Sequence, residues 1–218
     1  GVGGGAYYGP SYGSAEAPEA PGSAGGGYSA IGSTGKKGGG AVRILAPGGT
    51  VTINGAITAD GEDGANYCGA GSGGGIYIAC KAIAGTNGLV STLGGDGDTS
   101  PDASGGGGRI AVCYDPTAQS AMPFPSIAFR THPSKRESPD LLGDVGSLYF
   151  TDAQLLTENI SLLSGDIAIP GFDEWSISRL TISNTWVCFR STNQFALTVT
   201  GDLRIIYSDP TKFFSRLE

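Results

Sequence analysis

Four stretches of the chain can be laid over one another: GGGAVRILA (38–46), GGGIYIAC (73–80), GGGGRIAVCY (105–114) and GDVGSLYF (143–150). After each glycine-rich start, apolar residues recur at every second position, which is the pattern of a half-buried strand. Two inward positions align at spacings of 34, 34 and 38 residues: Val42, Ile76, Ile110 and Leu148, followed two residues later by Ile44, Ile78, Val112 and Phe150. The residues between them are expected to face outward: Arg43, Tyr77, Ala111 and Tyr149.

A second strand repeats in the same units, because NGAITADGEDG (54–64) lies over NGLVSTLGGDG (87–97) at a spacing of 33. Each unit is therefore a strand, a turn, a second strand and a long glycine-rich excursion. Such a unit cannot bury its apolar side alone, whereas stacked copies form a continuous ladder. The pattern predicts an all-β fold, a right-handed parallel β-helix (solenoid) with long glycine-rich loops in its N-terminal half, the hand following from that of parallel crossovers. A two-sheet sandwich is the main alternative.

Glycine is unevenly placed: 34 of the 39 glycines fall in residues 1–108 and 5 in residues 109–218. We expect long-loop coils of period about 34 over residues 1–150, and shorter coils continuing the same solenoid over residues 151–218. Glycine in the long loops is expected to supply positive φ angles and close backbone approach. Residues 116–140 are interpreted as one strand, Ser126–Arg130, and an exposed loop. The later inward positions are expected to be Ile177, Leu180, Ile182, Leu197, Val199, Leu203 and Ile205.

Composition excludes several classes of protein. The net charge is −7, with 20 acidic against 13 basic residues and no concentrated basic face, so nucleic acid is not an expected partner. No apolar run approaches the roughly 20 residues of a membrane span, and membrane insertion is not expected. The glycine clusters lack the every-third spacing of collagen. Because the chain begins at Gly1 and its single methionine is Met122, we expect a processed or excerpted piece whose signal peptide is already gone.

The run from GGGAVRILAPGGTVTINGAITADGEDG through GSGGGIYIAC to SGGGGRIAVCYD resembles the glycine-rich right-handed parallel β-helix repeats, of the pectin-lyase-like superfold, in large secreted or surface proteins of microbes. FDEWSISRLTISNTWVCF and LTVTGDLRI are similar to the shorter coils that follow such repeats. The resemblance covers residues 1–115 well and residues 143–206 loosely. It implies an extracellular or cell-surface location and a structural or adhesive role. The Asn-Thr-Asp, paired-Asp and Arg-Ile-Lys motifs of pectinase-like enzymes are absent from the sequence.

The four cysteines, Cys68, Cys80, Cys113 and Cys188, have no C-x-x-C spacing. A zinc or redox site is therefore not expected. Disulfides in an oxidising compartment are expected instead, with inert buried thiols as the alternative. Three full pairings are open.

Acidic residues gather at equivalent turns, and the GGDGD string (94–98) is similar to turns that bind calcium between neighbouring coils. Asp63, Asp96 and Asp98 are the candidate calcium ligands, and calcium is the one candidate cofactor. The full nonapeptide pattern does not recur, so solvated turn carboxylates are the simpler interpretation. A carboxyl pair of this kind could also serve glycoside hydrolysis.

Other candidate features concern the surface. Several tyrosines could stack on sugars or on a neighbouring chain, or pack against the sheet: Tyr7, Tyr8, Tyr12, Tyr28, Tyr67 and Tyr77. Asn159 begins an Asn-Ile-Ser glycosylation sequon, and a weaker one begins at Asn66. His132 lies in a loop rich in Pro and Ser, where we expect it to be solvated, and no nucleophile motif accompanies it.

Neither GVGGGAYYGP nor TKFFSRLE is typical of a capping element, so both ends of the coil are expected to be open edges. These observations predict a non-enzymatic extracellular structural protein, part of a surface fibre, filament or adhesin, that forms homo-oligomers or filaments through its ends. The alternative is a carbohydrate-binding or polysaccharide-cleaving protein, with an acidic polysaccharide as partner. A passenger segment of a secreted bacterial adhesin is a third interpretation.

Overall fold

The computed structural model describes residues 13–27, 32, 34–65, 67–97, 104–133, 143–191, 194–207 and 216–217. The regular structure of the described chain is almost entirely strand, which confirms the all-β expectation. The strands are β1 (Ala41–Thr52), β2 (Ala56–Thr58), β3 (Gly75–Ala84), β4 (Gly88–Ser91), β5 (Arg109–Cys113), β6 (Ile127–Arg130), β7 (Ser147–Phe150), β8 (Asn159–Ile160), β9 (Leu163–Ala168), β10 (Glu174–Ile177), β11 (Leu180–Ser183), β12 (Trp186–Arg190), β13 (Ala196–Val199), β14 (Leu203–Ile206) and β15 (Arg216–Leu217). In the described part of the chain two short helices join them, α1 (Pro116–Ser120) and the 3-10 helix η3 (Ala153–Leu155).

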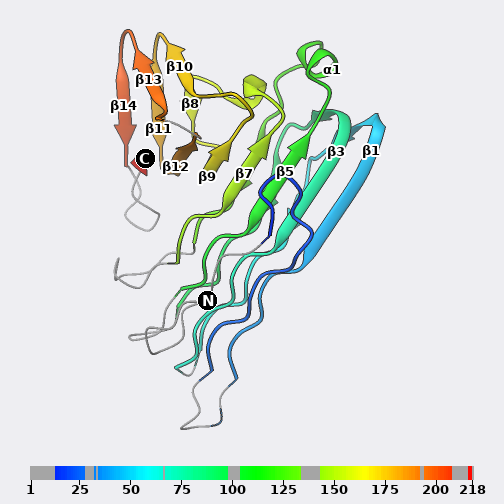
Figure 1. Cartoon of the computed structure of the whole chain (residues 1–218), viewed down its shortest axis with the longest axis vertical. Helices are drawn as coiled ribbons and strands as arrows, with labels where there is room; N and C mark the ends of the chain where they lie inside the picture. Colours follow the sequence, from blue (N-terminus) through cyan, green and yellow to red (C-terminus); the bar gives the residue numbers. More distant parts are fainter. Residues whose placement is uncertain are drawn as a thin grey trace.

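The predicted ladder between the repeats is confirmed. Strands β1, β3, β5 and β7 pair in parallel, side by side (Figure 1), with Val42 on Ile76, Ile76 on Ile110 and Ile110 on Leu148. The second ladder follows the same register from Ile44 to Phe150. Strands β2, β4 and β6 form a second parallel row, with Ile57 on Val90.

The predicted right-handed parallel β-helix was wrong as a description of the fold. The two rows are not separate sheets stacked along a solenoid: they join in one parallel sheet of order β1-β3-β5-β7-β9-β6-β4-β2, which curls into a half-barrel. Strand β9 makes the junction, because its Leu163 pairs with Phe129 of β6 while its Ile167 pairs with Leu148 of β7.

The junction has a local cause. In the earlier units a glycine-rich excursion separates the strand of one row from the next strand of the other row. Strand β9 pairs with both rows and has no such excursion between the two pairings. Gly165 lies at the change of partner, and a Cβ there would stand 2.2 Å from the Thr131 hydroxyl. That hydroxyl lies 2.9 Å from the Gly146 carbonyl and 3.2 Å from the Ser164 carbonyl. A larger residue at position 165 would therefore displace the Thr131 hydroxyl from these two carbonyls.

Apolar side chains fill the concave side of the sheet. Phe129 of β6 and Phe150 of β7 meet edge to face, with ring centroids 5.4 Å apart. Both rings are buried, as are the ladder residues Ile76, Ile110 and Leu148. The two rows thus share one core, and burial of these side chains is the main stabilising contribution in this part of the molecule.

The glycine-rich excursions form a second packed region, here called the glycine bundle. It consists of residues 22–26, 35–40, 59–64, 69–75, 92–97, 104–108, 131–132 and 143–146, extended segments that run on from the ends of the strands (Figure 1). In the segment 69–75, the N–H groups of Gly69 and Ser72 donate to the segment 22–26, while those of Gly71 and Gly74 donate to the segment 59–64. Partners that recur every third residue indicate an extended helix with three residues per turn, because a strand would repeat every second residue.

Close packing explains the glycines of the bundle. A Cβ at Gly73 would lie 2.0 Å from the Thr92 carbonyl oxygen, and one at Gly105 would lie 1.9 Å from the Gly71 carbonyl oxygen. The expected close approach is confirmed, but the expected positive φ is not. The positive-φ glycines of the described chain all lie outside the bundle: Gly13, Gly32, Gly165 and Gly171.

The C-terminal part has a shorter repeat and three strands per unit. Strands one unit apart pair in parallel at a sequence distance of 22 residues: Asn159 with Thr181, Gly165 with Val187, and Trp175 with Leu197. Of the predicted inward positions, Leu180 and Ile182 are buried and Ile177, Leu197 and Val199 are half-buried. Leu203 and Ile205 pair with Leu180 and Ile182 and therefore lie on the predicted inward side, but both are about half exposed.

The segment 116–140 also departs from expectation. Its predicted strand is confirmed as β6, but residues Pro116–Ser120 form the helix α1 rather than loop. Asp115 is the N-cap, accepting hydrogen bonds from the N–H groups of Thr117 and Ala118, and Pro116 opens the helix. This Asp-Pro pair is a recognised helix start.

Candidate interaction surface

The predicted calcium ligands contribute to bonds between neighbouring turns. The Asp63 carboxylate accepts a hydrogen bond from the N–H of Asp96 at 2.8 Å, and the Asp96 carbonyl accepts one from the N–H of Gly64. Asp98 lies outside the described residues. Nearby, the Asp60 carboxylate accepts from the Ser91 hydroxyl and the Leu93 N–H. The described residues contain no group of three His, Cys, Asp or Glu side chains that could hold a metal ion.

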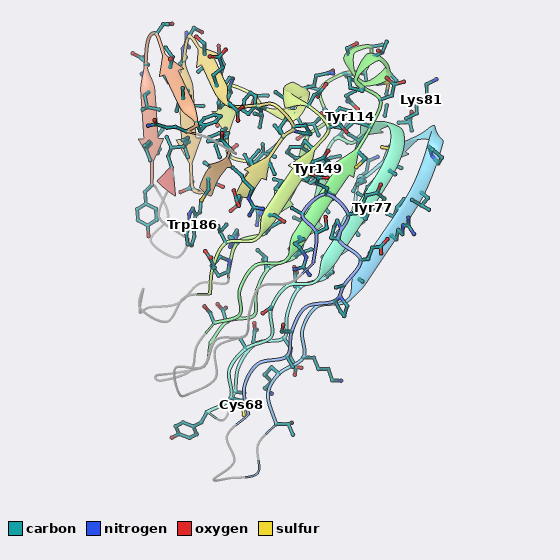
Figure 2. All side chains as sticks on the ribbon, viewed as in Figure 1. Cys68, Tyr77, Lys81, Tyr114, Tyr149 and Trp186 are labelled. Atoms are coloured by element: carbon teal, nitrogen blue, oxygen red, sulfur yellow. The ribbon has the colours of Figure 1, made fainter. Side chains whose placement is uncertain are left out.

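The predicted disulfides were wrong, because Cys68, Cys80, Cys113 and Cys188 are all free thiols. Cys113 is paired with Ala79, so Cys80, the next residue along β3, points to the opposite face of the sheet. Cys68 lies at the far tip of the glycine bundle (Figure 2). Burial raises the pKa of both the Cys80 and the Cys113 thiols, which keeps them protonated and unreactive.

The outer side of strands β1, β3, β5 and β7 carries the side chains that were predicted there, but much of it is covered. Arg43 stacks over the Tyr77 ring at 5.6 Å from its centroid, and both Tyr77 and Tyr149 are half-buried. Ala111, on the strand between them, is 0% exposed. Figure 2 shows Tyr77 and Tyr149 on either side of the N-terminal segment.

Residues 13–20 form this covering segment, here called the strap. Pro18 is buried, and a Cβ on Gly75 of β3 would lie 3.2 Å from the Pro18 Cβ. The Arg109 guanidinium donates to the Ala20 carbonyl at 3.4 Å, and Glu19 lies 3.9 Å from Arg43. Nothing in the sequence indicated a strap, since its residues carry no strand or helix pattern.

The remaining tyrosines and the sequon divide between described and undescribed positions. Tyr67 is exposed near the tip of the bundle, whereas Tyr7, Tyr8, Tyr12 and Tyr28 lie outside the described residues, as does Asn66. Asn159 is exposed in β8, where a glycan could be attached without displacing core residues. Glycosylation of Asn159 stays a prediction.

His132 is partly buried in the glycine bundle rather than solvated, which corrects the expectation. Its carbonyl accepts a hydrogen bond from the N–H of Gly94, and its Nδ1 lies 2.6 Å from the Pro133 carbonyl. Burial lowers the pKa of His132, so the ring is neutral near pH 7.

A buried tyrosine was missed by the sequence reasoning. The Tyr114 hydroxyl donates to the Asp152 carboxylate at 2.5 Å, and the other carboxylate oxygen accepts from the Gln154 side chain at 2.6 Å. Burial raises the pKa of Tyr114 far above its usual range. The group joins the end of β5 to η3, and its neutral, fully bonded tyrosine fits a structural role.

The N-terminal edge of the sheet is strand β1, which among the described strands pairs only with β3. Its register shifts between Ala46 and Thr50, where Pro47 removes one backbone donor. A proline and a bulge are two means by which proteins protect an edge strand from pairing with another chain. This edge is therefore poorly suited to a continuous added strand.

The C-terminal edge is different. Strand β14 pairs only with β11 among the described strands, and it contains neither a proline nor a register shift. Leu203 is 47% exposed and Ile205 is 50% exposed. The same part of the chain contains a cluster of aromatic rings in which Phe189 and Phe195 stack with their centroids 4.7 Å apart. Exposed apolar residues grouped on one strand are typical of a surface that associates with a partner.

Comparisons with protein-family models, with curated proteins and with solved structures find no match to this chain. No helix in the described part of the chain is long and apolar enough to cross a membrane.

Proposed function

We propose that this chain is a non-enzymatic structural protein of the cell exterior, a rigid segment of a surface fibre, filament or adhesin that associates with copies of itself through an exposed end. The observation that carries the proposal is the apolar strand β14, which pairs only with β11 among the described strands and in which Leu203 and Ile205 are about half exposed. A soluble protein rarely leaves such a strand uncovered unless it is an interface.

Rigidity supports the same role. The curled sheet is held by one apolar core, and the glycine bundle by backbone hydrogen bonds between extended segments. Tyr77 and Tyr149, which a polysaccharide partner could have stacked on, flank the strap instead. The extracellular location rests on the resemblance to secreted repeat proteins and is part of the proposal.

Self-association is tested by sedimentation velocity over a hundredfold concentration range, together with negative-stain microscopy of the same samples. We expect the average mass to rise with concentration and particles to join at their ends. Release of soluble sugars from a panel of acidic polysaccharides, by a protein that stays monomeric throughout, would support the polysaccharide-cleaving alternative and refute this proposal.

A further inference from the structure

Two Asn-Gly pairs occupy equivalent turns of neighbouring units. Asn54 and Gly55 lie between β1 and β2, whereas Asn87 lies directly before Gly88, the first residue of β4. The two turns are in register, because β2 pairs with β4. An asparagine that precedes glycine can react with its own main chain, since glycine has no side chain to hinder attack by its nitrogen on the asparagine amide. The two turns therefore offer the same local chemistry in two different settings.

The side-chain carbonyl of Asn54 is held by the next unit. Its Oδ1 accepts hydrogen bonds from the Thr86 N–H at 3.0 Å and from the Thr86 hydroxyl at 3.3 Å. When a nucleophile adds to an amide carbon, negative charge develops on the carbonyl oxygen, and donors already directed at that oxygen stabilise the charge. Two donors on this one oxygen are therefore an arrangement that promotes attack on the Asn54 amide.

The nucleophile in the first turn is accessible. Gly55 is exposed, and a Cβ at this position would meet nothing within 4 Å. Within the described chain the Gly55 N–H donates no hydrogen bond. An exposed main-chain N–H without a partner loses its proton to solvent base more readily than one that is bonded in a sheet. The Gly55 nitrogen can therefore be deprotonated while the rest of the turn stays folded.

The second turn lacks both features. The Gly88 N–H donates to the Ser126 carbonyl at 3.1 Å, and Gly88 is buried. By the register of β4 with β6, the residue of the following unit that corresponds to Thr86 is Pro125. Proline has neither an N–H nor a hydroxyl to donate. Asn87 is thus followed by a nitrogen that is already bonded, and the corresponding position supplies no donor.

We infer that Asn54 is a site of spontaneous modification, where the asparagine of the folded chain converts to aspartate or isoaspartate through a cyclic imide. The Gly55 nitrogen, having given its proton to solvent base, attacks the Asn54 side-chain carbon and forms a new C–N bond. The side-chain nitrogen takes a proton from water and leaves as ammonia. Water then adds to either carbonyl of the imide and opens it. The Thr86 donors stabilise the charged oxygen of the addition step.

The modification changes the turn permanently. It adds one negative charge to a chain whose net charge is −7, at a position where the Thr86 donors can bond the new carboxylate. The isoaspartate product also lengthens the main chain between β1 and β2 by a methylene group. Because the ammonia is lost, asparagine is not regenerated, and the converted fraction rises with the age of the protein.

Timed incubation of the full, folded chain at mildly alkaline pH tests the inference. Peptide mass spectrometry, after digestion at mildly acidic pH, follows the conversion of amide to carboxyl separately at Asn54 and at Asn87. We expect Asn54 to convert about tenfold faster than Asn87. In concentrated urea, where both turns are unfolded, the two rates should be similar. This second measurement separates the effect of the fold from that of the local sequence.

Two matched variants test the role of the donors. Thr86→Val removes the hydroxyl and keeps the N–H, so it should slow conversion of Asn54 several-fold and leave the rate at Asn87 unchanged. Thr58→Val, at an exposed threonine of β2, should change neither rate. Urea unfolding checks that both variants are folded, and the comparison within the wild-type chain stands without them. Equal rates at the two sites of the folded chain, faster conversion of Asn87, or a Thr86→Val variant in which Asn54 converts as fast as before or faster would overturn the inference.

Discussion

The curled sheet and the glycine bundle are made from consecutive residues of the same repeating units, yet they are stabilised by different means. The sheet buries side chains such as Phe150 and Ile110. The bundle brings backbones together, as where Gly105 meets the Gly71 carbonyl, and it has almost no side chains to bury. The two regions should therefore respond to opposite changes: the sheet to loss of volume and the bundle to gain of volume.

Phe150→Ala should have the largest effect, because it empties the centre of the core where Phe129 and Phe150 meet. We expect the free energy of unfolding to fall by about 4 kcal/mol, measured by urea denaturation. Phe124→Ala, at a side chain that is 51% exposed, is the matched control and should cost far less. Equal effects of the two substitutions would mean that the core is not where the structure places it.

Gly105→Ala should have the second-largest effect on the free energy of unfolding, because its new Cβ would overlap a backbone carbonyl that cannot rotate away. We expect a loss of about 3 kcal/mol in the same measurement. At Gly40 a Cβ would meet nothing within 4 Å, so Gly40→Ala should be neutral or slightly stabilising. If both variants unfold at the same urea concentration, the bundle is not closely packed.

Tyr114→Phe tests a hydrogen bond of the sheet region, because it removes a hydroxyl and leaves the volume of the ring unchanged. It removes the hydroxyl that donates to Asp152 and leaves one carboxylate oxygen without that partner. The expected loss is about 1.5 kcal/mol by thermal or urea unfolding. Tyr149→Phe, at a half-buried ring on β7, controls for loss of a hydroxyl in general and should cost much less.

The smallest expected effect comes from His132 in the glycine bundle, and it is a dependence of stability on pH. Because burial lowers its pKa, the unfolded chain binds this proton more readily than the folded one. Stability should therefore fall as pH drops from above 6.5 toward the lowered folded value, and level off below it. His132→Gln should flatten this part of the stability curve, and an unchanged slope would assign the pH dependence to other groups.

The ladder of the sheet could be predicted because two independent regularities agree, the two-residue alternation and the equal spacing of Val42, Ile76 and Ile110. The joining of the rows could not. The joining depends on β9 pairing with both β6 and β7. The residues of β9, Leu163–Ala168, alternate in the same way as those of a strand that belongs to only one row, so the sequence does not reveal the double pairing. The exposure of Leu203 and Ile205 could not be predicted either, because both follow the inward pattern and periodicity does not report which described strand lies at the edge of a sheet.

The bundle did have a signal in the sequence. Glycines three residues apart recur in its segments: Gly22 and Gly25, Gly35 and Gly38, Gly61 and Gly64, Gly71 and Gly74, Gly94 and Gly97, Gly105 and Gly108, and Gly143 and Gly146. The spacing was obscured because interior segments carry further glycines between these positions. Of the candidate site, the outward tyrosines on the sheet could be placed, whereas the strap that lies between them has no pattern to predict it.

The three-residue period of the bundle has a consequence for how such a protein can diversify. In the outer segment 34–40, the exposed residues are Thr34, Lys37 and Gly40, one position in three. The backbones of Lys37 and Gly40 are hydrogen-bonded to neighbouring segments, whereas the side-chain positions face solvent. These positions can therefore become basic, acidic or aromatic while the backbone hydrogen bonds are kept. Within one short segment, some positions of the three-residue repeat maintain the packing and others determine the surface chemistry. A substitution at a surface position can therefore change the surface without changing the packing.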